Sequence, residues 1–193
     1  MNLALFDFDG TLTRRDTLLD FLRFSFGTRR FILGSISTAP FIAAFKLGLY
    51  PNWRAKERLL SYFLRGQAKT TLALQAERYV DAVMPTIFKP QMLETLREHQ
   101  RNGDTILLVS ASPEDWIGVF AKRLGVPFVA TCLAVNNGTL TGKIEGKNCY
   151  GPEKVARISA TIDIKSYDKI FAYGDSRGDR EMLALATQQP KMI

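Results

Sequence analysis

The feature that most constrains this chain is a short apolar run that ends in two closely spaced acids. Residues 3–6 read Leu-Ala-Leu-Phe, and the chain continues as Asp7-Phe8-Asp9-Gly10-Thr11-Leu12-Thr13. An apolar run of this length, bounded by polar residues and glycine, is typical of a strand buried in a parallel sheet. Gly10 lets the backbone turn away after it. Because ligands of open α/β sheets bind beyond the carboxyl ends of the strands, Asp7 and Asp9 lie where a functional site is expected.

The length and the cysteine content limit the class of protein. A chain of 193 residues can form one core domain with a modest insertion. Cys132 and Cys149 are too few for a disulfide framework and lack the spacing of a zinc site, which fits a reducing compartment. The first strand starts so early that no room remains for a signal peptide. We therefore expect the protein in the cytoplasm, or peripherally on the cytoplasmic face of the membrane.

The net charge of +7 is concentrated in one segment. Residues 14–81 contain 12 basic and 5 acidic side chains, whereas the rest of the chain is balanced, with 14 of each sign. Such an excess indicates an anionic surface or substrate at this segment, with a solubilising face as the alternative. The segment has no obvious platform of interleaved basic and aromatic residues, so no nucleic-acid partner is expected.

The basic segment is expected to be helical. The pattern of apolar residues predicts four helices, over residues 17–24, 29–50, 53–65 and 70–84. Gly66 would end the third helix and Pro85 the fourth. We interpret the four helices as an insertion between the first strand and the rest of the core.

Residues 31–45 carry no charge and are flanked by Arg29, Arg30 and Lys46. Fifteen uncharged residues fall short of the ~20 that span a bilayer, and Pro40 also argues against a span. Two interpretations stay open. The segment lies in a membrane interface with its basic flanks on anionic head groups, or it forms a hydrophobic helix that is kinked at Pro40 and buried in the insertion.

A second core strand is predicted at residues 105–109, where it leads into Ser110, Ala111 and Ser112. Ser112 is expected to cap a helix that starts at Pro113. A hydroxyl and free backbone N–H groups at the start of a helix form a ready binding site for phosphate. Ser110 and Ala111 are therefore candidate phosphate ligands.

The last third of the chain continues the alternation of strands and helices. The pattern predicts a strand at 128–130, a hairpin over 131–146, a helix from Pro152, a strand at 169–173, a helix over 181–187 and the start of an edge strand at Ile193. Lys154 lies in the first turn of one of these helices, and Asp175 and Asp179 follow a strand. The single histidine, His99, is interpreted as a surface residue rather than a catalyst.

Four segments resemble the motifs of the haloacid dehalogenase-like phosphohydrolases. The segment 7–13 resembles the first motif, Ser110 the second, Lys154 the third and the segment 174–179 the fourth, in the order of that superfamily. The resemblance implies an α/β fold with a doubly wound, mainly parallel Rossmann-like sheet, an inserted all-α helical cap and a small β-hairpin. The cap and hairpin are features of the phosphoserine-phosphatase-like branch. The catalytic core would be residues 1–13 and 86–193, and the cap residues 14–85.

The resemblance also implies a reaction and a role for each site residue. Asp7 would be the nucleophile that forms an aspartyl-phosphate, and Asp9 the general acid and base. Mg²⁺ would be held by Asp7, by Asp175 and by the backbone carbonyl of Asp9, while Asp179 holds a metal-bound water or orients a neighbour. The phosphate would be bound by Gly10, Ser110, Ala111 and Lys154.

The expected substrate is a phosphomonoester, and the start of the cap bears on which one. In the phosphoserine phosphatases an acidic residue after the first motif helps to read the amino group of the substrate, and Asp16 stands at the matching place. Arg14 and Arg15 precede it and suit an anion better than an amine. Residues 6–24, together with the apolar and basic cap, resemble the proteobacterial branch that removes the terminal phosphate of phosphatidylglycerophosphate.

A lipid phosphate is therefore the favoured substrate, because the cap offers apolar surface for acyl chains and cations for head groups. The first alternative is a soluble phosphatase for a small metabolite such as phosphoserine or histidinol phosphate, whose apolar cap helices are merely packed. The remote alternative is a non-catalytic protein that binds anionic membranes through its basic cap.

Overall fold

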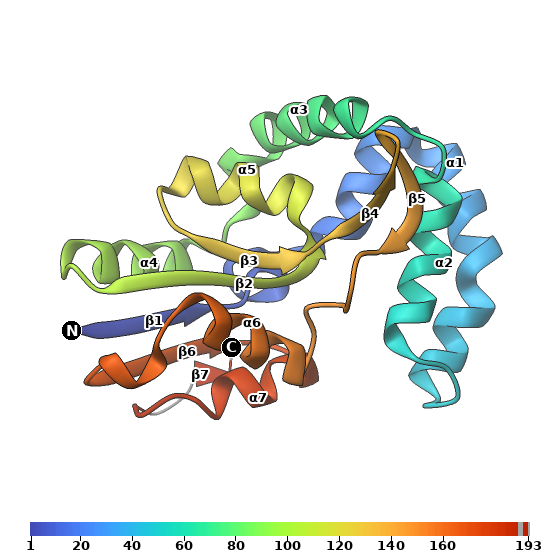
Figure 1. The fold of residues 1–193 in the computed structure, drawn as a ribbon. Helices are drawn as coiled ribbons and strands as arrows, with labels where there is room; N and C mark the ends of the chain where they lie inside the picture. The colour runs from blue at the N-terminus through green and yellow to red at the C-terminus, as the bar shows by residue number, and fades with distance from the viewer. Residues whose placement is uncertain (189–190, 193) are drawn as a thin grey trace.

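The structure, a computed structural model, describes residues 1–188 and 191–192. A parallel sheet forms its centre, and the described strands stand in the order β3-β2-β1-β6-β7 (Figure 1). Their bounds are β1 (Asn2–Phe6), β2 (Thr105–Pro113), β3 (Phe128–Thr131), β6 (Lys169–Gly174) and β7 (Lys191–Met192). The chain thus starts in the middle of the sheet, between β2 and β6. Strand β7 fits the expected edge strand, although Ile193 itself lies outside the described residues.

Helices cover both faces of the sheet, which confirms the doubly wound α/β fold. One face carries α4 (Pro90–Arg101) and α5 (Glu114–Leu124), and the other carries α6 (Pro152–Thr161) and the short α7 (Arg180–Leu183). All four side chains from Leu3 to Phe6 are completely buried. The apolar run at the start of the chain therefore lies at the centre of the core, as its lack of alternation predicts.

The predicted hairpin is formed by β4 (Leu133–Asn136) and β5 (Thr139–Ile144), which pair antiparallel. Asn137 and Gly138 make its turn with positive φ angles of 47° and 75°, the conformation that a two-residue hairpin turn needs. The hairpin also contacts the inserted helices, because Ser61 Oγ in α2 (Asn52–Leu64) donates to the carbonyl of Gly142 over 2.9 Å.

Residues 14–85, all of which the structure describes, form three helices rather than the predicted four: α1 (Thr17–Lys46), α2 and α3 (Lys69–Ile87). The first two predicted helices are joined in α1, which changes direction at Gly27, where φ is 76° and ψ is 161°. Only glycine readily adopts these angles. Helix α3 passes Pro85, since a proline near the end of a helix removes only a bond of the last turn. The division into cap and core remains a prediction.

Residues 31–45 are not buried in the cap, so that interpretation is wrong. Gly34 and Thr38 are buried, and Gly34 faces Phe63 in α2. On the outer side of α1, however, Ile32 and Leu33 are 50% and 62% exposed. Helical backbone angles continue through the proline at residue 40. Among the described helices, none has the length and apolar character needed to cross a membrane.

Two predictions around β2 and α7 also differ from the structure. Strand β2 extends to Pro113, so α5 starts at Glu114 and Ser112 does not cap it. The Ser112 hydroxyl donates instead to Asp9 Oδ2 over 2.6 Å. The last helix, predicted over residues 181–187, is the single turn of α7.

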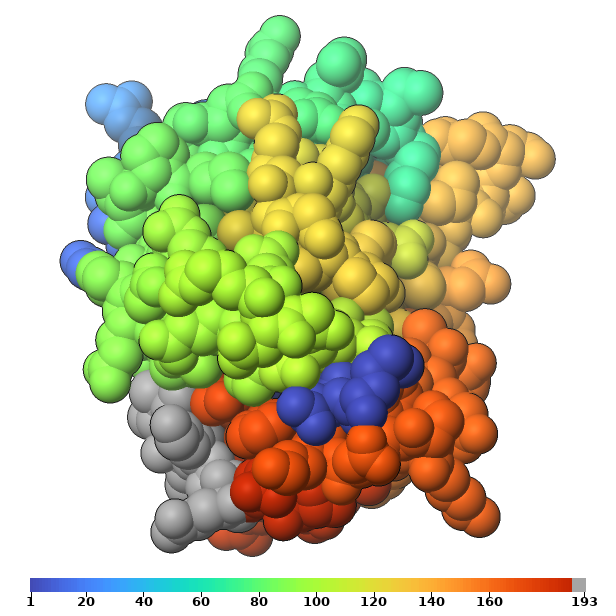
Figure 2. All heavy atoms as spheres, turned by 90° about the vertical axis from the view of Figure 1, so that its left-hand side faces the viewer, coloured from blue at the N-terminus to red at the C-terminus, as the bar shows by residue number. Residues whose placement is uncertain are grey.

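His99 is buried, and its interpretation as a surface residue is wrong. Its Nδ1 lies 2.7 Å from Asp104 Oδ2, and its Nε2 lies 2.9 Å from Tyr173 Oη. These two partners satisfy both ring nitrogens inside the core, so the side chain links α4 to β6 and to the residue that precedes β2. Figure 2 shows this side of the molecule, away from the cap, where the first residues of the chain (dark blue) reach the surface beside α4.

Candidate active site

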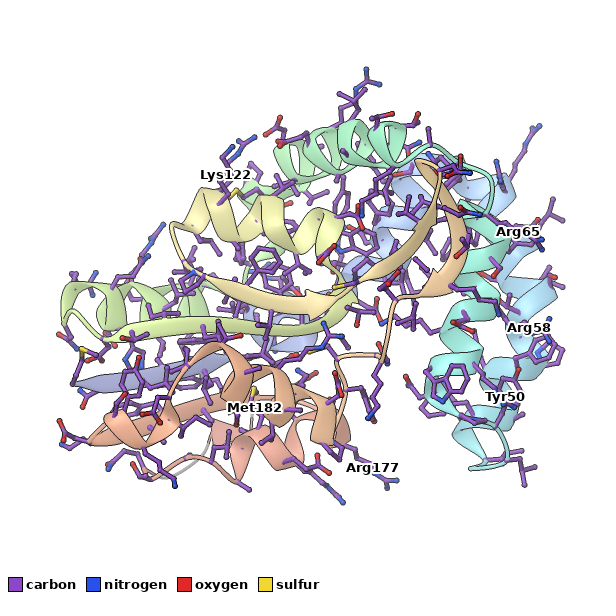
Figure 3. All side chains as sticks on the ribbon, viewed as in Figure 1. Tyr50, Arg58, Arg65, Lys122, Arg177 and Met182 are labelled. Atoms are coloured by element: carbon purple, nitrogen blue, oxygen red, sulfur yellow. The ribbon has the colours of Figure 1, made fainter. Side chains whose placement is uncertain are left out.

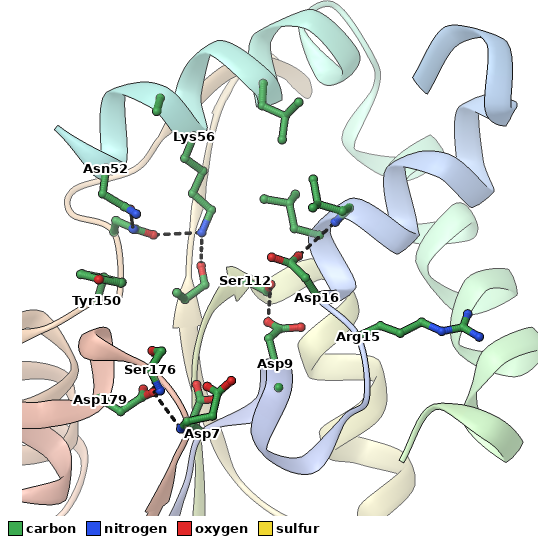
Figure 4. Close-up of a pocket in the computed structure, with 18 of the residues that line it drawn as sticks. Asp7, Asp9, Arg15, Asp16, Asn52, Lys56, Ser112, Tyr150, Ser176 and Asp179 are labelled. Carbon is green, nitrogen blue, oxygen red and sulfur yellow. Dashed lines mark hydrogen bonds between the residues drawn. The ribbon is translucent and has the colours of Figure 1, made fainter. Parts of the chain in front are cut away.

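A pocket of about 500 Å³ lies where the carboxyl ends of β1, β2 and β6 face the cap (Figure 4). Its core side contains most of the residues that the sequence predicts for the site: Asp7, Asp9, Gly10, Ala111, Lys154, Asp175 and Asp179. Its cap side combines apolar and polar residues. The apolar ones are Leu18, Leu19, Ile42, Phe45, Ala55 and Leu59, and the polar ones are Arg14, Arg15, Asp16, Asn52 and Lys56. The pocket thus joins a charged floor to a wall of mixed character.

Asp7 comes directly after β1, and its backbone N–H donates to the Tyr173 carbonyl over 2.9 Å, as if the strand continued. Its carboxylate is almost fully buried and accepts two hydrogen bonds, from Lys154 Nζ at 2.6 Å and from Thr11 Oγ1 at 2.8 Å. Burial raises the pKa of Asp7 to about 6, although the charge of Lys154 opposes the rise. Asp7 is therefore fixed in one orientation at the pocket floor.

Lys154 neutralises the pocket floor from the first turn of α6. Its Nζ donates to Asp7 Oδ1 and to Asp179 Oδ1, both over 2.6 Å, and to the Val109 carbonyl over 2.9 Å. Burial alone would lower the pKa of Lys154, but the two carboxylates outweigh burial and raise it. The side chain therefore stays charged, although it is only 1% exposed.

Asp9 lies on the cap side of Asp7 and has different partners. Its Oδ1 accepts the backbone N–H of Thr17 over 2.6 Å, and its Oδ2 accepts the hydroxyls of Ser112 and Ser110 over 2.6 and 3.3 Å. Burial and then the nearby charge of Asp16 raise the pKa of Asp9. A carboxyl group that holds its proton more readily than usual is suited to give it to a leaving oxygen.

Three carboxylates meet at the end of the sheet. Oxygens of Asp7, Asp175 and Asp179 lie within 4.8 Å of one another. Burial, followed by the charges of Asp7 and Asp179, raises the pKa of Asp175 to about 6. A Cβ atom on Gly10 would overlap Asp175 Oδ2, so this approach requires glycine. Hard oxygen ligands at this spacing fit a divalent cation such as Mg²⁺.

Asp179 differs from Asp175 in its hydrogen bonds. Its Oδ1 is engaged by Lys154, and its Oδ2 accepts the backbone N–H and the hydroxyl of Ser176 over 2.9 and 2.7 Å. Asp175 makes no ion pair with any residue that the structure describes. This difference is consistent with the predicted roles, in which Asp175 binds the metal and Asp179 supports the site.

Other predicted site residues are less central. Ser110 is fully buried beneath the pocket, where its hydroxyl donates to Asp9 and accepts the backbone N–H of Ser112. Arg14 and Arg15 line the outer pocket, but Arg15 extends away from the carboxylates, toward Asp20 at 3.4 Å (Figure 4). Asp16 caps α1 by accepting the backbone N–H of Leu19 over 3.1 Å.

Sequence reasoning missed six polar residues that line the pocket: Asn52, Lys56, Ser112, Asn148, Tyr150 and Ser176. Lys56 counted only as part of the basic excess. A signal was present, because Lys56 shares the buried face of α2 that carries Leu59 and Leu60. A lysine on the apolar face of an amphipathic helix requires an explanation. Asn148 lies in a loop, where periodicity gives no such signal.

Several known proteins are similar to this chain in sequence. A family model described as haloacid dehalogenase-like hydrolase matches residues 4–184. The chain is 30% identical over 191 residues to Protein CicA of Caulobacter vibrioides, covering 97% of this chain and 84% of that protein. It is 26% identical over 192 residues to phosphoserine phosphatase SerB1 of Mycobacterium tuberculosis, covering 94% and 61%. It is 25% identical over 207 residues to a histidinol-phosphatase of Neisseria meningitidis, covering 97% and 88%.

Solved structures share the fold. A Bordetella pertussis protein described as having unknown function superposes with a TM-score of 0.82 at 25% identity, over 98% of this chain and 88% of that one. A phosphoserine phosphatase described as a phospho-aspartyl intermediate analogue gives a TM-score of 0.66 at 21% identity, over 95% and 82%. The second likeness concerns the fold alone.

Proposed function

The chain belongs to the haloacid dehalogenase-like hydrolases and is a phosphatase of that family, and we propose that its substrate is a phosphate monoester carried by a lipid. Membership of a hydrolase family argues against the alternative of a non-catalytic protein that only binds membranes. The proposal has two parts, which are the chemistry at the pocket floor and the recognition of the substrate by the cap.

The first step of the proposed reaction is an in-line attack of the Asp7 carboxylate on phosphorus. A bond forms between Asp7 and phosphorus, and the bond to the alcohol oxygen breaks. Asp9 gives its proton to that oxygen, which agrees with the raised pKa of its carboxyl group. Lys154, 2.6 Å from Asp7, offsets the negative charge that the phosphoryl group brings to the nucleophile.

The second step hydrolyses the aspartyl-phosphate. Asp9, now a carboxylate, takes a proton from a water molecule, and the resulting hydroxide oxygen bonds to phosphorus. The bond between phosphorus and Asp7 breaks, so inorganic phosphate leaves and the Asp7 carboxylate is restored. Asp9 therefore acts first as an acid and then as a base.

The three carboxylates at the pocket floor support a role for Mg²⁺. Asp7, Asp175 and the backbone carbonyl of Asp9 would hold the ion, and Asp179 would orient its surroundings. When bound, the ion supplies positive charge that offsets the charge on the phosphoryl oxygens.

One observation carries the lipid proposal: apolar side chains that line the pocket at the end of α1 are followed closely in the chain by exposed leucines. Ile42 and Phe45, in the last turns of α1, line the pocket. Just beyond them, in the turn to α2, Leu47 and Leu49 are 74% and 77% exposed. Leucines at a helix turn that stay this exposed in water are suited to contact acyl chains.

The charges of this part of the chain support an anionic lipid. Residues 21–56 contain no Asp or Glu, and the exposed cations among them include Arg29, Arg30 and Lys46. Arg58 and Arg65 add positive charge on the side of α2 (Figure 3). Cations close to apolar side chains match the head groups and acyl chains of anionic lipids. We therefore propose that the phosphatase works at the surface of an anionic membrane.

A small-metabolite phosphatase is the second candidate, and the relatives favour it. SerB1 and the Neisseria protein are named for phosphoserine and histidinol phosphate, and a pocket of about 500 Å³ has room for a small molecule. In this case the exposed leucines would have no part in recognition.

Phosphate release in the presence of Mg²⁺ distinguishes the two candidates. Phosphatidylglycerophosphate in mixed micelles is compared with a panel of soluble phosphomonoesters, and Asp7→Asn serves as the blank. The lipid proposal expects kcat/KM for the lipid to exceed that of the best soluble ester by at least about 100-fold, a difference of ~2.7 kcal/mol. A soluble ester that is hydrolysed faster than the lipid would contradict the lipid proposal.

A further inference from the structure

Lys56 is a cation without a carboxylate partner at the wall of the pocket. It extends from α2 toward the core, where its Nζ donates to the Ala111 carbonyl and, over 3.1 Å, to Asn148 Oδ1 (Figure 4). It forms no ion pair with any described carboxylate. Lys89, whose Nζ donates to the Gly10 carbonyl, likewise forms no ion pair with a described carboxylate. Three other lysines that bridge elements of the fold do form ion pairs, namely Lys69 with Asp115, Lys143 with Glu57 and Lys154 with Asp7 and Asp179.

An unpaired ammonium in this position is costly. Removing a charge from water is unfavourable unless opposite charge or several hydrogen bonds compensate it, and Lys56 has two neutral oxygen partners. Burial lowers the pKa of Lys56 to about 8, although the charges of Asp9 and Asp16 oppose this. A poorly hydrated ammonium that borders a pocket gains strongly from an anion in that pocket.

The core holds the ammonium in place. Asn148 is buried, its Oδ1 lies 3.0 Å from Thr131 Oγ1, and its Nδ2 donates to Asn52 Oδ1 over 2.8 Å. Thr131 Oγ1 also lies 2.6 Å from the Ala111 carbonyl, so both partners of Lys56 are fixed by the same group. A fixed ammonium loses little conformational freedom when a ligand binds.

The position of Lys56 indicates which part of a substrate it meets. Its partner Ala111 is followed by Ser112, whose hydroxyl donates to Asp9. Asp9 is the proposed proton donor to the alcohol oxygen, so Lys56 lies on the side of the leaving group. Lys154 already neutralises Asp7 and Asp179 on the phosphoryl side.

We propose that Lys56 binds an anionic group on the leaving alcohol, such as a phosphodiester or a carboxylate, and so determines substrate specificity. The inference rests on the proposed phosphatase activity and specifies its substrate class. It holds for a lipid with a second phosphate and for a small metabolite with a carboxylate. It predicts that esters of neutral alcohols are poorer substrates.

The test compares matched pairs of substrates in wild type and Lys56→Met. The lipid pair is phosphatidylglycerophosphate and a long-chain alkyl phosphate, and the soluble pair is 3-phosphoglycerate and glycerol 3-phosphate. For the anionic member of the pair that wild type hydrolyses, Lys56→Met should lower kcat/KM by about 10- to 100-fold, mainly through KM. The neutral member should change less than about 3-fold. Lys122→Met is the control, because Lys122 is an exposed cation of α5 and lies outside the pocket.

A second variant keeps the Lys56 ammonium but pairs it within the protein, so that it no longer attracts an anionic substrate group. Asn148→Asp gives Lys56 a carboxylate partner and should reduce the preference for the anionic member in the same way. An unchanged preference in Lys56→Met would overturn the inference. So would equal losses on both members together with weaker inhibition by inorganic phosphate, because Lys56 would then bind the phosphoryl group. If wild type hydrolyses no ester in either pair or in the wider panel, the proposed function fails instead.

Discussion

At the residue scale, the site depends on Lys154 standing between two buried carboxylates. The ammonium contacts Asp7 and Asp179 at 2.6 Å each, and the three side chains are nearly inaccessible to water. Without the lysine, two negative charges would face each other in a medium that solvates them poorly. The same cation is thus expected to serve both the folded state and the chemistry.

Lys154→Met should therefore reduce stability and activity together. We expect a loss of about 3–5 kcal/mol in the free energy of unfolding, because the buried carboxylates lose their partner. Phosphate release should fall by about 10³-fold or more. Chemical denaturation and steady-state kinetics measure the two effects. A variant with wild-type stability would contradict the role assigned to this contact.

The raised pKa values of Asp7 and Asp175, both about 6, predict how Mg²⁺ acts on stability. Between the ordinary pKa near 3.8 and about 6, the folded protein binds more protons at these groups than the unfolded chain does. Their contribution to the free energy of unfolding therefore decreases as the pH rises through this window. A divalent ion requires the deprotonated carboxylates, so its stabilising effect should grow over the same window.

Thermal unfolding with and without Mg²⁺ checks this expectation. The increase in Tm caused by the ion should be larger at pH about 8 than at pH about 5. An equal increase at both pH values would mean that the ion does not bind at these carboxylates.

The sequence predicted the site residues that follow strands, but it missed site residues that reach the pocket from a helix or a loop. Asp7, Asp9 and Asp175 converge because parallel strands end at one edge of a sheet, which the apolar runs before them already indicate. Lys56 and Asn148 reach the same pocket from a helix and a loop. Their approach depends on how the cap packs on the core, and local patterns do not carry that information.

At the scale of elements, the turn after β1 is built around a close contact. Gly10 has a φ of 81°, and a Cβ there would meet the Asp175 carboxylate. Gly10→Ala should displace Asp175 and lower activity by at least about 100-fold, because small displacements of reacting groups are that costly.

Gly66→Ala is the matched control for this variant. Gly66 has a similar φ of 84°, but a Cβ added there would meet no atom within 4 Å. Both variants should therefore suffer similar backbone strain, and only the one at Gly10 should lose activity and the Mg²⁺-dependent rise in Tm. Equal activity losses would show that strain alone is responsible.

The helices of the cap show where sequence patterns reach their limit. The break between the first two predicted helices is real and lies at Gly27, but the chain continues directly into the next helical segment. The apolar residues of α1 predict contact with an apolar surface. The pattern does not tell whether that surface belongs to the rest of the protein or to a membrane, and in the structure Ile32 and Leu33 are exposed.

At the scale of the whole molecule, the turn between α1 and α2 exposes Leu47 and Leu49 next to the exposed Lys46. If this turn meets a membrane, vesicles with anionic lipids should bind the protein, and salt should weaken the binding. The double variant Leu47→Glu with Leu49→Glu should reduce vesicle affinity by at least about 10-fold, because it removes apolar contact and adds negative charge. Co-sedimentation measures the affinity.

Leu74→Glu provides the control for that experiment. Leu74 is 63% exposed on α3, so it tests an exposed leucine outside the α1–α2 turn. The affinity of the Leu74→Glu variant for vesicles should stay close to that of wild type. Equal weakening by both changes, or no binding by wild type, would contradict the membrane surface and favour a soluble substrate.

The overall architecture was predictable because the order of motifs implies the order of strands. The doubly wound sheet, the hairpin and the helical insertion are all implied by the resemblance of the four motifs to those of the family. The exposure of α1 was not predictable, since burial is a property of the assembled molecule.

The most direct test of the proposed mechanism is to locate the phosphoryl group during turnover. An aryl phosphate, whose leaving group needs no proton, is mixed with the Asp9→Asn variant and Mg²⁺, quenched in acid and analysed by mass spectrometry of peptides. The mechanism predicts a phosphoryl group on Asp7, which accumulates because the amide that replaces the Asp9 carboxylate cannot activate water. Release of the aryl alcohol with no phosphoryl group on the chain, or with one on another residue, would contradict it.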